Sequence, residues 1–69
     1  METKIGRIES VGIRVAKVAI AEGDNGHREF TGSELWAEFG DCPLPLVIAG
    51  KWVRIDGMYG RWTITSIED

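Results

Sequence analysis

Apolar and polar residues alternate most clearly in the C-terminal segment of this chain. Two strands are predicted there, on either side of a loop over Gly57–Gly60, with Asp56 opposite Arg61. In this register one face carries Val53, Ile55, Trp62 and Ile64. The other face carries Trp52, Arg54, Asp56, Arg61, Thr63 and Thr65. A register slipped by one residue would destroy this separation, so the pattern predicts a β-hairpin.

The N-terminal stretch 5–20 is compatible with two structures. Apolar residues occur at helical spacing at Ile8, Val11, Val15 and Val18. Gly6 and Gly12 and the many β-branched residues disfavour a helix, because each interior glycine costs about 1 kcal/mol relative to alanine. We therefore favour two strands, Ile5 to Ser10 and Ile13 to Ala21, with Gly12 at the bend.

A turn is predicted between Glu22 and His27, because Asn25-Gly26 tolerates the positive φ angles of a tight hairpin. The returning strand would start near Arg28 and continue towards Phe39.

Residues 33–39 also fit a short helix that begins after Ser33 and stops at Gly40. The pattern leaves strand and helix open for this segment.

The segment between Gly40 and Gly50 is predicted to be a crossing loop, because Pro43 and Pro45 cannot donate to a β-ladder. Its apolar residues Leu44, Leu46, Val47 and Ile48 are expected to plug one end of the core, as a single helical turn.

These elements predict a mainly β fold of about five strands in mostly antiparallel pairing, closed into a small SH3-like or OB-like barrel. With 69 residues, the chain is long enough for one domain over residues 1–69 and too short for two. The hydrophobic content of 43% and the charged content of 28% are those of a globular protein.

The formal net charge of −3 argues against a general duplex-DNA binder, which clusters Lys and Arg on one face. No apolar run reaches the roughly 18 to 20 residues of a membrane helix, and no signal peptide is visible. The lone Cys42 cannot form an internal disulfide, which is typical of a reducing compartment. We expect a cytoplasmic protein that does not bind membranes.

Few residues suggest chemistry. His27 is expected to be a solvated turn residue, and Cys42 a small, at least half-buried hydrophobe without a cationic neighbour. Glu34 and Glu38 are spaced as on a metal-binding helix but lack a histidine partner. There is no phosphate-binding glycine loop. The sequence therefore predicts no metal, no cofactor and no catalytic site, and an enzyme is the least favoured class.

The polar face of the last hairpin is the main candidate surface. Trp52 beside Arg54 and Arg61 combines residue types that dominate interaction hot spots. The same set could stack single-stranded bases, or Trp52 could belong to the core. Tyr59 with Met58 at the loop tip is a second candidate contact, unless Tyr59 folds back over Trp62. The candidate binding residues are Trp52, Arg54, Tyr59, Arg61 and Trp36.

The first functional hypothesis is a non-enzymatic protein-binding module that acts on another protein or forms a self-dimer. By analogy, small acidic domains of this kind are typical of accessory adaptors and inhibitors, including those of phages and mobile elements. The alternative is a single-stranded nucleic-acid binder that uses the same face.

Overall fold

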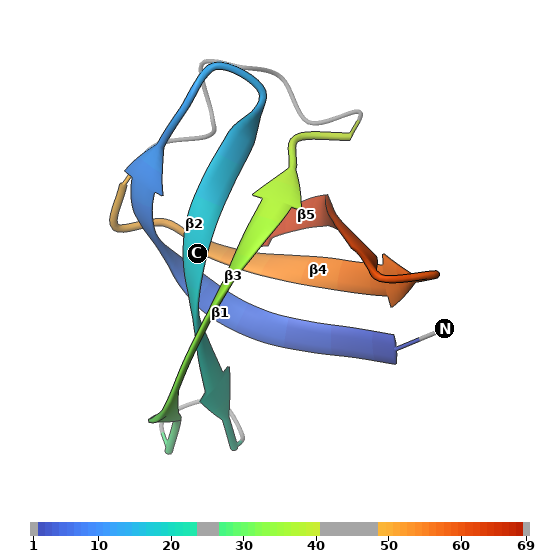
Figure 1. Ribbon diagram of the computed structural model, residues 1–69. Helices are drawn as coiled ribbons and strands as arrows, with labels where there is room; N and C mark the ends of the chain where they lie inside the picture. The colour runs from blue at the N-terminus through green and yellow to red at the C-terminus, as the bar shows by residue number, and fades with distance from the viewer. Residues whose placement is uncertain (1, 24–26, 41–48, 69) are drawn as a thin grey trace.

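The computed structural model describes residues 2–23, 27–40 and 49–68, and within these ranges every regular element is a strand. Figure 1 shows five of them, namely β1 (Glu2–Val11), β2 (Val15–Glu22), β3 (Glu29–Glu38), β4 (Trp52–Met58) and β5 (Arg61–Glu68). The predicted mainly β fold class is confirmed.

The strands form one sheet that closes into a ring in the order β1-β2-β3-β5-β4. Strand β4 returns to lie beside β1, the first of three consecutive strands joined by hairpins, and this is a Greek-key order. The ring closes where β3 meets β5 in parallel, and among the described residues this contact consists of Ala37 with Trp62 and Glu38 with Thr63. A five-stranded Greek-key barrel corresponds to the OB-like alternative.

The core fills the inside of this ring. Alternate residues of the strands point inward, and the largest fully buried side chains are Ile8, Ile55, Ile64, Val18 and Val53. Ala16 and Ala37 are also fully buried, so their small side chains let the strands approach closely. The side chains predicted to form the inner face of the last hairpin are therefore in the core, with Trp62 partly buried against it.

The two N-terminal strands are confirmed, and the helix alternative for residues 5–20 is wrong. Gly6 pairs with Ile20 and Ile8 with Val18 in an antiparallel ladder. Gly12 starts the turn between β1 and β2, where its N–H donates to the carbonyl of Val15 at 2.7 Å. Backbone pairing and β-branched packing thus outweigh the helical spacing of the apolar residues.

The possible short helix over residues 33–39 is also wrong, because this segment is the second half of β3. Leu35 pairs with Val18 and Ala37 with Ala16, which places Ala37 inside the barrel and leaves Trp36 56% exposed. The alternation of a strand places Ala37 inside and Trp36 outside, whereas a helix would have left the β2 edge without a partner.

The last hairpin forms, but its predicted register is wrong by two residues next to the turn and by three beyond a bulge. Met58 pairs with Arg61 and Gly57 with Trp62, so the loop consists of Tyr59 and Gly60 alone. Gly57 lies in the strand opposite Trp62, whose ring comes within 2.6 Å of where a β-carbon would be, so a larger residue here would displace the ring. Between Met58 and Ile55 a slip of two residues keeps each side chain on its predicted face. A bulge between Arg54 and Ile55 then shifts the pairing by one more residue, and Val53, Ile55 and Ile64 are all buried as predicted.

Several predictions fall on residues that the structure does not describe. These are the turn residues Asn25 and Gly26, the thiol of Cys42, and the plug and loop over residues 41–48.

Candidate functional site

The five predicted binding residues are divided between two ends of the barrel. Trp52 begins β4 and Arg54 follows it, whereas Tyr59 and Arg61 lie beyond the other end of β4. Trp36 lies on β3, two residues before Glu38, which contacts Arg61. The structure therefore brings Tyr59 and Arg61 together, leaves Trp52 and Arg54 apart from them, and places Trp36 on the strand that carries the Glu38 partner of Arg61.

Trp52 is half-buried in a stack of two aromatic rings with an arginine at each end. Its ring is stacked on that of Phe30, with centroids 5.6 Å apart and an interplanar angle of 17°. The guanidinium of Arg28 lies 4.9 Å from the Trp52 ring, and that of Arg7 lies 4.9 Å from the Phe30 ring. These contacts hold the start of β3 against β1 and β4, so Trp52 contributes to the fold.

Arg54 lies near this stack on the same strand, and its guanidinium is 3.1 Å from a carboxylate oxygen of Glu68. Thr65 also donates its hydroxyl hydrogen to the Arg54 carbonyl at 3.2 Å. The side chain of Arg54 thus forms an ion pair that links β4 to β5, and both Arg54 and Glu68 are partly exposed.

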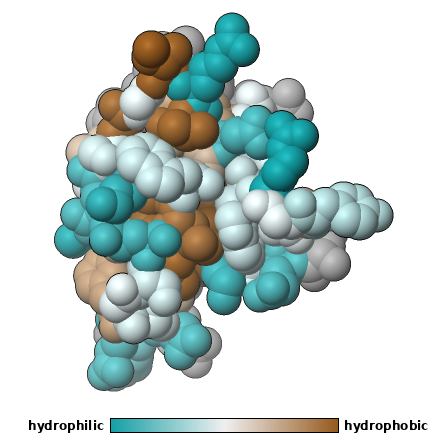
Figure 2. Space-filling view, viewed as in Figure 1, coloured by the Kyte–Doolittle hydropathy of each residue, from teal (hydrophilic) through white to brown (hydrophobic). Residues whose placement is uncertain are grey.

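Two turns that lie away from Trp52 carry exposed apolar side chains. Figure 2 shows hydrophobic residues gathered over the turn that joins β1 and β2, at the top of the view. Ile13 in this turn is 92% exposed, and Met58 at the end of β4 is 50% exposed. Isolated exposed hydrophobic residues are common in folded proteins, but several around one depression indicate a contact surface.

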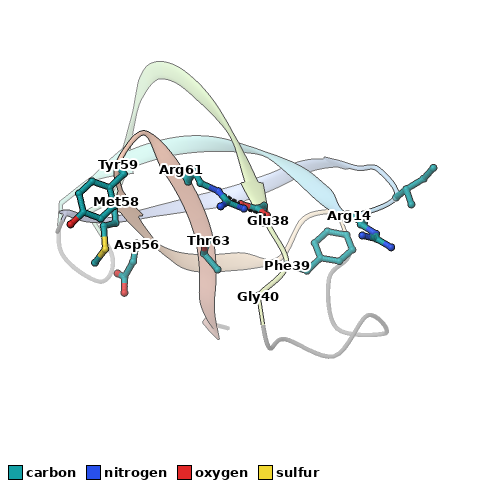
Figure 3. A pocket seen from close by; sticks show the side chains of 10 residues that line it. Arg14, Glu38, Phe39, Gly40, Asp56, Met58, Tyr59, Arg61 and Thr63 are labelled. Atoms are coloured by element: carbon teal, nitrogen blue, oxygen red, sulfur yellow. Dashed lines mark hydrogen bonds and ion pairs between the residues drawn. The ribbon is translucent and has the colours of Figure 1, made fainter.

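A cleft of about 990 Å³ lies between these residues, and we call it the loop-end cleft. It is lined by Ile13, Arg14, Glu38, Phe39, Gly40, Asp56, Met58, Tyr59, Arg61 and Thr63. Figure 3 shows Tyr59 and Met58 at one end of the cleft, Arg14 and Phe39 at the other, and the Arg61–Glu38 pair between them. The cleft is thus built by the β1–β2 turn, the β4–β5 turn and the junction of β3 with β5.

Arg61 and Glu38 form a two-pronged ion pair across that junction. The Nε of Arg61 donates to one carboxylate oxygen at 3.1 Å, and its Nη2 donates to the other at 3.0 Å. The hydrogen bonds from Arg61 to Glu38, and then the charge of Glu38, raise the pKa of Arg61 above its usual value. Arg61 therefore stays charged at any working pH, and the contribution of its raised pKa to stability would be lost only in strong alkali. The predicted pairing of Asp56 with Arg61 does not form, because the register places Asp56 opposite Thr63 and Arg61 opposite Met58. Asp56 accepts a hydrogen bond from the Thr3 hydroxyl at 2.7 Å.

Tyr59 occupies an unusual backbone conformation. Its φ is 54° and that of Gly60 is 78°, which are the angles of a type I′ turn, where Asn-Gly is preferred. The Tyr59 side chain is 96% exposed. The alternative in which Tyr59 folds back over Trp62 is therefore wrong.

Sequence reasoning missed Ile13, Arg14 and Phe39 as parts of this site. Ile13 and Arg14 were assigned to a strand, although they form the turn after Gly12. The available signal was an isoleucine directly after a turn glycine, where a large apolar side chain has no core to enter. Phe39 is 8% exposed, and its N–H donates to the Arg14 carbonyl at 3.3 Å, which holds the turn against the end of β3.

Comparison with protein-family models, curated proteins and solved structures finds no match to this chain. In the described parts of the chain, no three His, Cys, Asp or Glu side chains gather as metal ligands would. Those same parts contain no helix with the length and apolarity that spanning a membrane requires.

Proposed function

We propose that this chain is a non-enzymatic protein-binding module, an accessory adaptor or inhibitor that contacts another protein through its loop-end cleft. The observation that carries this proposal is Tyr59, whose ring is 96% exposed on a backbone with φ of 54°. Such a conformation costs a non-glycine residue about 1 kcal/mol. Because the ring is almost fully exposed, it returns little of this cost through packing. Strained, exposed residues are concentrated at functional sites.

The side chains around Tyr59 suit a protein partner. Tyr59 and two arginines line the cleft, so residue types that dominate interaction hot spots occur together, and Met58 beside them is 50% exposed. Two arginines and two carboxylates line the cleft, so the formal charges of its lining residues sum to zero. A neutral cleft with apolar edges resembles the centre of a protein interface more than a phosphate-binding groove.

A single-stranded nucleic-acid binder is the second candidate, and the position of the cleft favours it. Oligonucleotides bind OB-like barrels at the face of strands 2 and 3 and at the loops that join strands 1 to 2 and 4 to 5. The loop-end cleft lies between the same two turns. The exposed ring of Tyr59 at this cleft is suited to stacking on a base. The balanced charge of the cleft makes this the weaker proposal.

The test compares wild-type protein with Tyr59→Asn and Glu22→Gln variants as immobilised baits in lysate of the source organism. Glu22 is a suitable control because it is exposed and lies at the far end of β2 from the cleft. A partner should be retained by the wild type and by Glu22→Gln and lost by Tyr59→Asn. With the purified partner, calorimetry should give a Kd at least about tenfold weaker for Tyr59→Asn, as expected for an aromatic hot spot.

Three results would contradict the proposal. Equal affinity of the purified partner for wild type and Tyr59→Asn would place the interface elsewhere, and a Trp52→Ala variant would then be tested. Recovery of nucleic acid without a protein partner would favour the second candidate. Concentration-dependent self-association in sedimentation experiments, abolished by Tyr59→Asn, would make the partner a second copy of this chain.

A further inference from the structure

Most cationic side chains of the described residues contact a carboxylate or an aromatic ring, but one that lines the loop-end cleft does not. Among the described residues, five cations lie 3.0–3.6 Å from a carboxylate oxygen, namely Lys4, Arg7, Lys17, Arg54 and Arg61. Arg28 and Lys51 have contacts as well. Arg14 differs from these cations, because its side chain has no hydrogen bond, ion pair or ring contact within the described residues. It is exposed and lines the cleft.

The carboxylates of the cleft are already engaged. Both oxygens of Glu38 accept hydrogen bonds from Arg61, and Asp56 accepts one from Thr3. Figure 3 shows Arg14 at the Phe39 end of the cleft, separated from Asp56 by the Arg61–Glu38 pair. An unmatched guanidinium therefore lies beside an apolar surface in a chain whose net charge is −3.

We infer that the partner of the loop-end cleft presents an extended acidic segment, with an apolar side chain against Ile13 and Phe39 and a nearby carboxylate on Arg14. This inference rests on the proposed function and names the chemistry of the partner. The carboxylate can accept two parallel N–H bonds from the guanidinium, which fixes the register of the segment. The apolar side chain covers the exposed surface of Ile13, which is 92% accessible in the free protein.

The net negative charge of the chain affects how such a segment would bind. Long-range attraction is absent for an acidic ligand, so electrostatic steering should not accelerate association. The contact with Arg14 is short-range and should act on dissociation and on the choice of sequence. The specificity for a carboxylate should therefore depend on Arg14 and not on the overall charge.

The test uses acetylated and amidated peptides in which a central phenylalanine is followed, at varied spacing, by Asp, Asn, Lys or phosphoserine. Binding is followed by two-dimensional NMR of the isotope-labelled protein at the amides of Ile13, Arg14, Gly40 and Tyr59. The best Asp peptide should bind about fivefold more tightly than its Asn counterpart. In Arg14→Gln this preference should vanish, while both peptides still shift the cleft amides.

The control is Lys17→Gln, which changes the net charge by the same amount and removes a cation that lies on β2 outside the cleft. It should keep the preference for Asp. Equal binding of Asp and Asn peptides to the wild type, or equal loss of the preference in both variants, would overturn the inference. A phosphoserine peptide that binds best through Arg14 would also overturn it, because the recognised anion would then be a phosphate.

Failure of this inference is distinguishable from failure of the proposed function. Peptides that shift the cleft amides without regard to charge would leave a protein-binding cleft and remove only the acidic specificity. If no peptide shifts these amides, the acidic-segment inference is wrong. The comparison of Tyr59→Asn with wild type on the purified partner would still decide the proposed function independently.

Discussion

At the scale of single residues, Tyr59 occupies a backbone conformation that its residue type disfavours. A type I′ turn needs positive φ at both central residues, which Gly60 supplies without steric cost. Tyrosine adopts this conformation at a cost, since its β-carbon approaches a backbone carbonyl. A ring that is 96% exposed regains little of that cost by burial. The turn is therefore less stable than the same turn with asparagine.

The Tyr59→Asn variant should consequently be more stable than the wild type, by about 1 kcal/mol. For a chain of this size, that corresponds to a rise in Tm of roughly 4–8 °C, measured by circular dichroism. Tyr59→Phe, which keeps the strain, should change the Tm by no more than about 2 °C. A fall in Tm for Tyr59→Asn would mean that the tyrosine ring stabilises the fold, which would remove the main support for a binding role.

At the scale of elements, the β2–β3 hairpin is bent over β1. In Figure 1 it extends below the other strands. Its ladder is interrupted between Ala19 and Ala21, where β3 contains three residues, 31–33, opposite Ile20. The hydroxyl of Thr31 donates to the Ile20 carbonyl at 3.3 Å and accepts from the Ser33 N–H. Such bulges bend a strand and redirect its side chains, and here Phe30 reaches the Trp52 ring.

Removal of the Phe30 ring should therefore loosen this hairpin. We expect Phe30→Ala to lower the free energy of unfolding by about 1–2 kcal/mol, because stacking and cation–π contacts are lost together. Urea unfolding would give this value, and hydrogen exchange should accelerate at the β2 and β3 amides more than at those of β4 and β5. Trp36→Ala, an exposed aromatic on the same strand without a ring contact, should cost less. A larger loss for Trp36→Ala would show that the stack contributes little.

The sequence predicts the strands better than their long-range contacts. Alternation identifies the inner face of the last hairpin. Val53, Ile55 and Ile64 are assigned to this face with the predicted four-residue loop, and they are buried with the two-residue loop that forms. It cannot choose the loop length, because Gly57 and Gly60 both permit a turn. In the register that forms, the ring of Trp62 lies over Gly57, a contact that the alternation of apolar and polar residues does not indicate.

The candidate site could be predicted only in part for the same reason. The sequence indicates Tyr59 as a contact residue because it lies between Gly57 and Gly60 in a predicted turn, and it indicates Arg61 because it follows that turn. Their cleft also needs the β1–β2 turn and the β3–β5 junction, where Arg61 meets Glu38 from 23 residues away. Parallel closure of β3 on β5 leaves no local signature, so Arg14 and Phe39 could not be placed in the cleft from the sequence.

At the scale of the whole molecule, the distribution of charge decides between the two candidate functions. The chain has eight Lys and Arg against eleven Asp and Glu. Several of these cations are paired with carboxylates on neighbouring strands, as Lys17 is with Glu34 and Arg54 with Glu68. Single-strand binders instead line a groove with unmatched cations, whose phosphate contacts release counterions.

The protein should accordingly show no binding to a labelled single-stranded DNA of about 15 deoxythymidines, a length that covers the usual site of one barrel. Fluorescence anisotropy at about 50 mM salt should give a Kd weaker than about 10⁻⁴ M, the weak limit of non-specific binding. Tight binding that weakens at least tenfold by about 200 mM salt would instead support the nucleic-acid candidate. Arg14→Gln should then reduce the salt slope by about one contact, while Lys17→Gln, outside the cleft, should leave it unchanged. The same arginine would in that case recognise a phosphate, so this measurement tests which anion the loop-end cleft accepts as well as which class of partner it binds.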